Sequence, residues 1–137
     1  MPEKATLDRA RKDKAEGKSP STQAGEFVRE EMDHIREGKH GAKSTKQAIA
    51  IGLSKARRAG VALKAPKKGR VSEATRKSAQ RDLAKGRKQK QSGSGAKTTS
   101  AKRSRATLNA LKREPRSAAS HAALSRQAKS AARKRAA

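Results

Sequence analysis

The sequence predicts an all-α protein, in which a small helical hairpin core follows an N-terminal helix and precedes a long basic tail of marginal or disordered helices. Three observations support this prediction. Apolar residues recur at helical spacing in the middle of the chain, and capping signals and glycines bracket these stretches. Large core-forming side chains are scarce elsewhere: the 137 residues include one Phe, no Trp and no Tyr, and only 31% are hydrophobic.

The formal charge of +25 is unevenly distributed along the chain. Residues 1–63 contain 14 basic and 9 acidic side chains, whereas residues 64–137 contain 23 basic and 3 acidic side chains. Repulsion within such a cationic segment opposes compaction until a polyanion neutralises it. We therefore divide the chain into a mixed-charge helix and linker (1–19), a helical hairpin core (20–63) and a basic, Ala/Lys/Ser-rich tail (64–137).

The first two predicted helices differ in their apolar content. Residues 3–16 contain helix formers but only one large apolar residue, Leu7, which predicts a marginal helix. Ser19 and Pro20 suit the N-cap and first position of a second helix that ends near Glu37. One face of that helix is apolar, with Phe27 at its margin. The central residues of this face are Ala24, Val28, Met32 and Ile35.

The opposite face of the second helix carries four acidic residues at spacings of four, three and four. These residues are Glu26, Glu30, Asp33 and Glu37. Like charges at such spacing weaken an isolated helix, so basic neighbours should compensate them. Two interpretations follow: a solvated face balanced by nearby Lys and Arg, or a docking surface for the basic tail that DNA displaces.

The stretch from Gly38 to Gly60 predicts a connector and a third helix. Gly38 suits a left-handed helix end, and the sequence from Ser44 to Gln47 matches a capping box. The helix should end near Ala59. Its predicted core face consists of Ile49, Gly52, Leu53 and Ala56, with the glycine permitting close approach to the second helix.

Other residues of this helix lie outside the predicted core face. Lys55 and Arg58 should point away from the core, and Lys46 and Arg57 should line its rim. Ile51 either covers a small second contact or belongs to a nucleic-acid or dimer surface. After the helix, Val61 and Leu63 should fold back over the hairpin.

Beyond a basic hinge at 65–70, the sequence predicts three further helical segments, at 72–90, 98–114 and 117–135, with a flexible linker at 91–95. High helix propensity favours them, but each has only one or two large apolar residues. We expect no core to hold these helices in water, and we expect phosphate to stabilise them by neutralising their charge.

The sequence contains no recognisable catalytic constellation, and we expect neither an enzyme nor a cofactor. Absence of cysteine excludes disulfides and thiolate metal sites. We expect no metal at His34, His40 or His121, because their spacing matches no closed ligand set. We expect these histidines to occupy hydrated polar positions, although protonated His40 is also a candidate for contact with a phosphate. No apolar run approaches the roughly 20 residues of a membrane span and no signal-peptide core is present, so we expect a cytoplasmic, nucleoid location.

The excess of basic residues predicts nucleic-acid binding, because neutralising phosphates releases counterions. Near-absence of aromatics disfavours a base-stacking platform, so non-specific contact with the backbone of duplex DNA is preferred. The alternatives are an RNA-binding or ribosome-associated accessory protein, and a helical protein-interaction module. The predicted contact residues are Lys43, Lys46, Lys55, Arg57, Arg58, Lys64, Lys67, Lys68, Arg70, Lys102, Arg103, Arg105, Arg133, Lys134 and Arg135. The start of the helix after Lys43, with Ser44 and Thr45, either holds one phosphate or is simply capped.

Residues 26–61, EFVREEMDHIREGKHGAKSTKQAIAIGLSKARRAGV, resemble the signature of a family of small, basic, uncharacterised bacterial proteins, a domain of unknown function. The segment LKREPRSAASHAALSRQAKSAARKR (111–135) is similar to the tails of that family. This resemblance implies a bacterial source and a DNA-binding role for some relatives. The Ala/Lys/Ser/Pro composition of the tail is also loosely similar to that of linker-histone tails.

Overall fold

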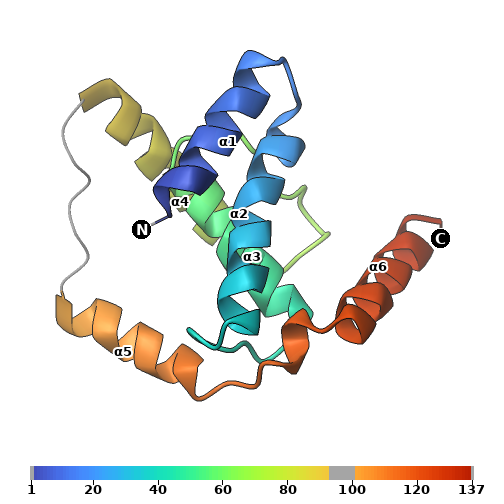
Figure 1. Ribbon diagram of the computed structural model, residues 1–137. Helices are drawn as coiled ribbons and strands as arrows, with labels where there is room; N and C mark the ends of the chain where they lie inside the picture. Colours follow the sequence, from blue (N-terminus) through green and yellow to red (C-terminus); the bar gives the residue numbers. More distant parts are fainter. Residues whose placement is uncertain (1, 93–100, 137) are drawn as a thin grey trace. The chain divides into compact units, whose positions relative to one another are not determined.

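The computed structural model describes residues 2–92 and 101–136, and within these ranges it is helical and contains no β-sheet (Figure 1). The α-helices are α1 (Lys4–Ala15), α2 (Pro20–Arg36), α3 (Thr45–Arg58), α4 (Glu73–Ser92), α5 (Ala101–Lys112) and α6 (His121–Ala136). A 3₁₀ turn, η1 (Ser117–Ala119), precedes α6. The predicted all-α class is confirmed.

The predicted signals at the ends of α3 are largely confirmed. The Gln47 N–H donates to Ser44 Oγ (3.2 Å), as a capping box requires. The Gln47 side chain accepts from the Lys43 N–H (2.6 Å), one residue earlier than the motif predicts. Gly38 after α2 and Gly60 after α3 have φ angles of 80° and 102°, which residues other than glycine rarely adopt.

The described residues form two compact units, each built from segments that are distant in sequence. Unit 1 contains the described residues up to Glu30 together with those from Ile51 to Ser92, and unit 2 contains Glu31–Ala50 together with those from Ala101 onward. Helices α2 and α3 therefore contribute one part to each unit. The division into 1–19, 20–63 and 64–137 follows the order of the chain and stays a prediction.

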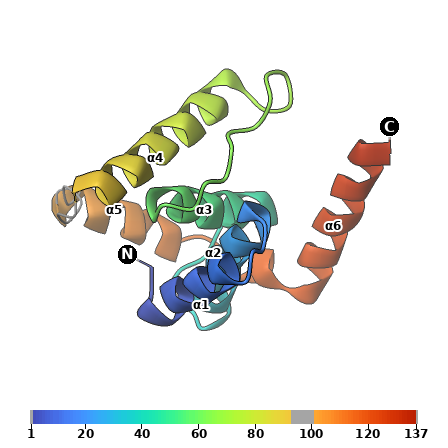
Figure 2. The same cartoon turned by 90° about the horizontal axis from the view of Figure 1, so that it is seen from above.

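The core of unit 1 surrounds Phe27, whose side chain is only 1% exposed. The predicted position of Phe27 at the margin of the apolar face is therefore wrong. Its buried neighbours in the cluster are Ala10, Ala24, Ala56 and Val61. Val61 and the partly buried Leu63 fold back onto this cluster, as predicted. Ala10 belongs to α1, which lies alongside α2 (Figure 2), so the N-terminal helix is part of the core.

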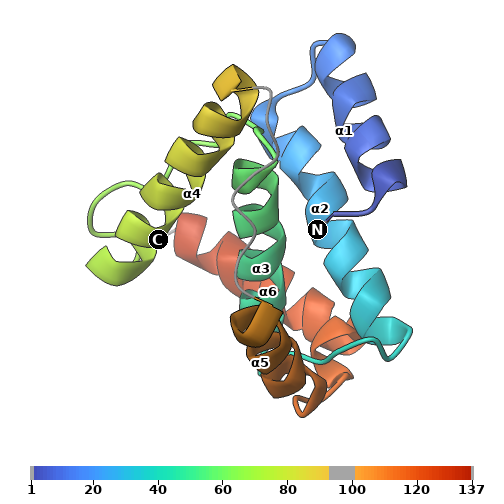
Figure 3. The same cartoon turned by 90° about the vertical axis from the view of Figure 1, so that its left-hand side faces the viewer.

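Glycine and alanine allow the helices of unit 1 to approach closely. A Cβ atom at Gly52 of α3 would lie 2.7 Å from Val28 Cα, which confirms the predicted close contact with α2. On α4, a Cβ atom at Gly86 would overlap the Arg57 carbonyl oxygen, and Ala79 is buried. Figure 3 shows α4 beside α3. The expectation that the helix after residue 72 has no core to hold it is wrong, because small residues provide its contact.

Helix α1 covers the part of the acidic face that belongs to unit 1. Arg9 Nε lies 2.6 Å from Glu26 Oε2, and the Glu3 backbone N–H donates to Glu30 Oε1 (2.6 Å). Glu30 is only 3% exposed, so the interpretation of a solvated face is wrong at this residue. These contacts come from α1 rather than from the basic tail.

In unit 2, the connector between α2 and α3 binds the segment that follows α5. The Gly41 N–H donates to the Leu111 carbonyl (2.8 Å), and the Ala42 N–H donates to the Pro115 carbonyl (3.0 Å). A Cβ atom at Gly41 would overlap the Glu114 carbonyl oxygen. The glycine-containing loop is therefore a docking site for the C-terminal segment as well as a connector.

An arginine of this C-terminal segment caps α2. Arg116 donates from Nε to the Ile35 carbonyl (3.3 Å) and from Nη2 to the Arg36 carbonyl. Arg36 in turn donates to the Ala119 carbonyl of η1 (3.1 Å). The carbonyls at the end of a helix have no partner within the helix, so a guanidinium satisfies them and also favours the negative end of the helix dipole.

We predict that Gly52→Ala destabilises the protein by about 1–3 kcal/mol, because the new methyl group meets the backbone of Val28. Gly25→Ala is the matched control: Gly25 lies within α2, and a Cβ there meets nothing within 4 Å. The control should stabilise the protein by about 0.5–1 kcal/mol through helix propensity. Urea unfolding followed by circular dichroism measures both. Equal effects of the two substitutions would contradict the close contact.

Candidate nucleic-acid interface

The chain between α3 and α4 forms an exposed basic loop in unit 1. Four of the predicted contact residues lie in it and are all exposed: Lys64, Lys67, Lys68 and Arg70. The backbone turns at Gly69, whose φ is 88°, and the Arg70 N–H donates to the Lys67 carbonyl (3.2 Å). No acidic residue occurs between Lys64 and Ser72. The turn therefore presents positive charge with no local counter-charge along the sequence.

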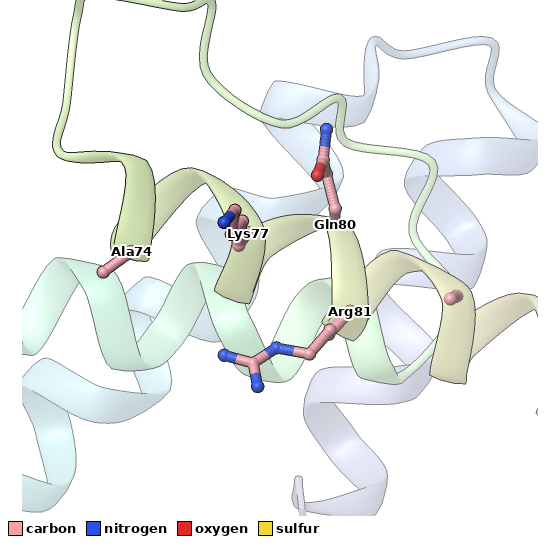
Figure 4. Close-up of a pocket in the computed structure, with 5 residues that line it drawn as sticks. Ala74, Lys77, Gln80 and Arg81 are labelled. Atoms are coloured by element: carbon pink, nitrogen blue, oxygen red, sulfur yellow. The ribbon is translucent and has the colours of Figure 1, made fainter.

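The outer face of α4 also carries basic residues that the sequence analysis did not select. Figure 4 shows Lys77, Gln80 and Arg81 projecting from this helix, with Ala74 one turn earlier. Together with Ala84 they line a shallow hollow that contains no acidic side chain. Lys77 and Arg81 are four residues apart and therefore share one helix face. That spacing is the sequence signal that could have identified them.

Arg57 is not available to a ligand. It is only 8% exposed, and its guanidinium donates from Nε to the Leu63 carbonyl (3.2 Å) and from Nη2 to the Lys64 carbonyl (3.2 Å). Burial lowers the pKa of Arg57 from its ordinary value, and the negative charge of Asp82 partly opposes this effect. The predicted position of Arg57 on an accessible rim is wrong: Arg57 holds the start of the basic loop against α3.

The other predicted cations at the end of α3 have partners or are partly covered. Arg58 Nε lies 3.8 Å from Asp82 Oδ1, and Asp82 also accepts from Ser54 Oγ (2.7 Å). Lys55 is half-buried. Asp82 therefore joins α4 to α3 and reduces the local positive charge, which makes this end of α3 a weaker phosphate-binding surface than the loop that follows it.

In unit 2, a hollow of about 400 Å³ gathers three basic side chains from different parts of the chain. Two of them, Lys43 and Lys46, were predicted contact residues at the start of α3, and the third, Arg126, comes from α6. The rest of the lining is Ser44, Thr45, Ser117, Ala118, Ala123, Gln127 and Ser130. The start of a helix carries partial positive charge, which adds to the attraction of the three cations for an anion.

For two further residues the sequence left a contact with phosphate open, and both have structural roles. Thr45 is buried, and its hydroxyl donates to the Ala118 carbonyl (2.6 Å), which fastens the start of α3 to η1. His40 is only 7% exposed and is bound within the connector, so its predicted hydrated position is wrong. Arg126 was missed because only the tertiary structure brings α6 to the start of α3.

The remaining predicted contact residues lie on α5 and at the end of α6 and are all exposed. They are Lys102, Arg103 and Arg105 on α5, and Arg133, Lys134 and Arg135 on α6. None of them lines the hollow at the start of α3. Consecutive helical residues are about 100° apart, so the last three spread charge around the helix rather than form one defined site.

The fold and these surfaces define a small all-α protein with exposed basic residues in both units. Residues 11–69 match a family of unknown function, DUF6496, and this stretch runs from α1 to the basic loop. No curated protein and no solved structure matches the chain. Within the described ranges, the helices are too short or too polar to span a membrane.

We predict that Arg57→Gln destabilises the protein by about 1–3 kcal/mol, because it removes the guanidinium bonds to two loop carbonyls. Lys67→Gln, at an exposed position of the same loop, should change the stability by less than about 0.5 kcal/mol. Denaturant unfolding of the two variants tests this difference. A neutral effect of Arg57→Gln would show that the guanidinium is not an anchor.

Proposed function

We propose that the protein binds double-stranded DNA without sequence specificity, through contacts with the phosphate backbone, as a nucleoid-associated protein. The observation that carries this proposal is the exposed basic loop from Lys64 to Arg70, which no acidic residue interrupts. A cationic surface of this kind gains affinity for DNA by releasing condensed counterions.

The surface of α4 supports the same function. Lys77 and Arg81 extend the basic character of unit 1 beyond the loop (Figure 4). Because these side chains are long and exposed, they can adjust to phosphates at several positions along a duplex. Such adjustable contacts position a protein on DNA and carry no direct sequence information.

The hollow in unit 2 offers a more defined contact. Lys43, Lys46 and Arg126 line it, and the start of α3 adds the partial positive charge of its backbone amides. A single backbone phosphate at this position would meet three cations and nearby hydroxyl groups. We therefore assign to unit 2 a contact with DNA that does not depend on the loop of unit 1.

The burial of Phe27 favours duplex DNA over single strands. Phe27 is the only residue among Phe, Tyr and Trp in the chain, and it is 1% exposed in the core of unit 1. Recognition of unpaired bases relies on exposed aromatic side chains that stack on them. Backbone binding needs no such platform. Our proposal is of a binding protein rather than an enzyme, located in the cytoplasmic nucleoid.

We expect duplex DNA to bind at low salt with an affinity that falls steeply as salt increases. The logarithm of the binding constant should fall with the logarithm of the salt concentration. Replacing Lys67, Lys68 and Arg70 by Gln should make this slope less steep by about one to three units, at about 0.9 per lost phosphate contact. The control replaces the exposed residues Lys4, Lys12 and Lys14 of α1 by Gln. It removes the same charge from a segment that has acidic neighbours. Fluorescence anisotropy with a labelled duplex measures the slopes. Absence of binding at low salt, or equal losses in the two variants, would overturn the proposal.

Competition separates DNA from RNA as the partner. An unlabelled DNA duplex should displace the labelled duplex at least as well as structured RNA does at equal phosphate concentration. Stronger displacement by RNA would instead assign the basic surfaces to an RNA-binding or ribosome-associated protein, since both partners offer the same phosphate chemistry.

A further inference from the structure

Three side chains with metal-binding groups converge in unit 2, and none of them is among the residues proposed to contact DNA. Glu31 and His34 lie one turn apart on α2, and His40 reaches them from the connector. One possible ligand atom from each residue lies within 4.8 Å of the other two. Glu31 is fully buried and His40 is 7% exposed, whereas His34 is half-buried. The rings of His34 and His40 meet edge to face, with their centroids 6.0 Å apart.

The surroundings of His40 place an oxygen beside each of its ring nitrogens. Nδ1 lies 3.0 Å from the Gly41 carbonyl oxygen, and Nε2 lies 3.0 Å from Glu31 Oε2. A carbonyl oxygen and an ionised carboxylate can accept hydrogen bonds but cannot donate them. A neutral imidazole has a single N–H. When Nδ1 donates to Gly41, the lone pair of Nε2 faces the Glu31 carboxylate, and a cation between them would be attracted by both groups.

A divalent metal ion satisfies this arrangement. Zn²⁺ binds His nitrogen and carboxylate oxygen at about 2.0–2.2 Å, which places two ligands of a tetrahedral ion roughly 3.3 Å apart. The separation of 3.0 Å between His40 Nε2 and Glu31 Oε2 is close to this value. Metal-bound histidines usually donate their second N–H to a carbonyl or carboxylate, which is the relation of His40 Nδ1 to Gly41.

We propose that Glu31, His34 and His40 bind a divalent first-row transition-metal ion, for which Zn²⁺ is the best fit. Two imidazoles and one carboxylate suit such an ion, whereas Mg²⁺ and Ca²⁺ prefer oxygen ligands throughout. Three protein ligands leave a fourth position for water. The spacing of the histidines in the sequence did not predict this site. Its third ligand is Glu31, and His40 comes close to Glu31 and His34 only because the connector turns back along α2.

The position of the site gives the ion a structural role. Two ligands belong to α2 and the third to the connector, whose next two residues, Gly41 and Ala42, bind the backbone of the segment at 111–115. The ion therefore fixes the connector against α2 and stabilises unit 2, since a ligand that binds only the folded state shifts the unfolding equilibrium.

The test is a calorimetric titration of the full-length protein, first stripped of metal with a chelator, with Zn²⁺ alone. We expect saturable binding of one equivalent and a higher melting temperature in Zn²⁺. His34→Ala should weaken the binding at least tenfold and abolish the increase in melting temperature. His121→Ala is the matched control, because His121 is exposed on α6 and should leave both unchanged. Far-UV circular dichroism verifies that each variant is folded.

A second measurement covers the case in which a variant does not fold. Co²⁺ bound to the wild-type protein should give visible absorption bands typical of a four-coordinate site, and one equivalent of Zn²⁺ should remove them. No saturable binding of Zn²⁺ to the folded wild-type protein would overturn the proposal and leave a proton between Glu31 and His40. Equal losses in folded His34→Ala and His121→Ala would also overturn it.

Discussion

The structure depends on how closely its helices can approach one another. The chain has few large apolar side chains, so helices at ordinary separations would leave voids that nothing fills. Gly52 and Gly86 instead bring the backbones of α2 and α4 against α3, and alanines complete the contact. Burial of many small surfaces replaces a large core, and Phe27 is the single bulky residue around which they gather. This economy explains how a chain with 31% hydrophobic residues forms a core in unit 1.

Polar anchors join the segments of unit 2. Arg116 binds the last carbonyls of α2, and Gly41 and Ala42 pair with the backbone after α5. In unit 1, Arg57 has a comparable role at the start of the basic loop. The arginines therefore fall into two groups. Arginines such as Arg57, Arg116 and Arg36 donate to backbone carbonyls. Arg70 and Arg126 are exposed and suit phosphate binding. The amino-acid composition alone does not distinguish these two groups of arginines.

One principle connects the hollow at the start of α3 and the proposed metal site. The hollow in unit 2 and the metal site each require groups from separate segments, and in both the fold rather than the local sequence produces the cluster. Lys46 and Arg126 line the same hollow because η1 is bound to the start of α3 and α6 follows η1. His40 meets Glu31 because the connector turns back along α2. A metal ion at His40 would stabilise the connector, whereas DNA would neutralise exposed charge.

The sequence by itself determined the helical class, the capping at Ser44, the helix ends at Gly38 and Gly60, and the close approach at Gly52, because these features depend on neighbouring residues or on one periodic face. It also identified the exposed lysines of the loop, because a charged run without acidic residues is solvated. Only the tertiary structure decided the burial of Glu30, His40 and Arg57 and the docking of α1, α4 and residues 111–116. The contacts of Glu30 and of these docked segments depend on partners distant in sequence, whereas His40 and Arg57 are held where the neighbouring loops turn back. Their contacts use glycine, alanine and backbone carbonyls, which leave no hydrophobic pattern in the sequence.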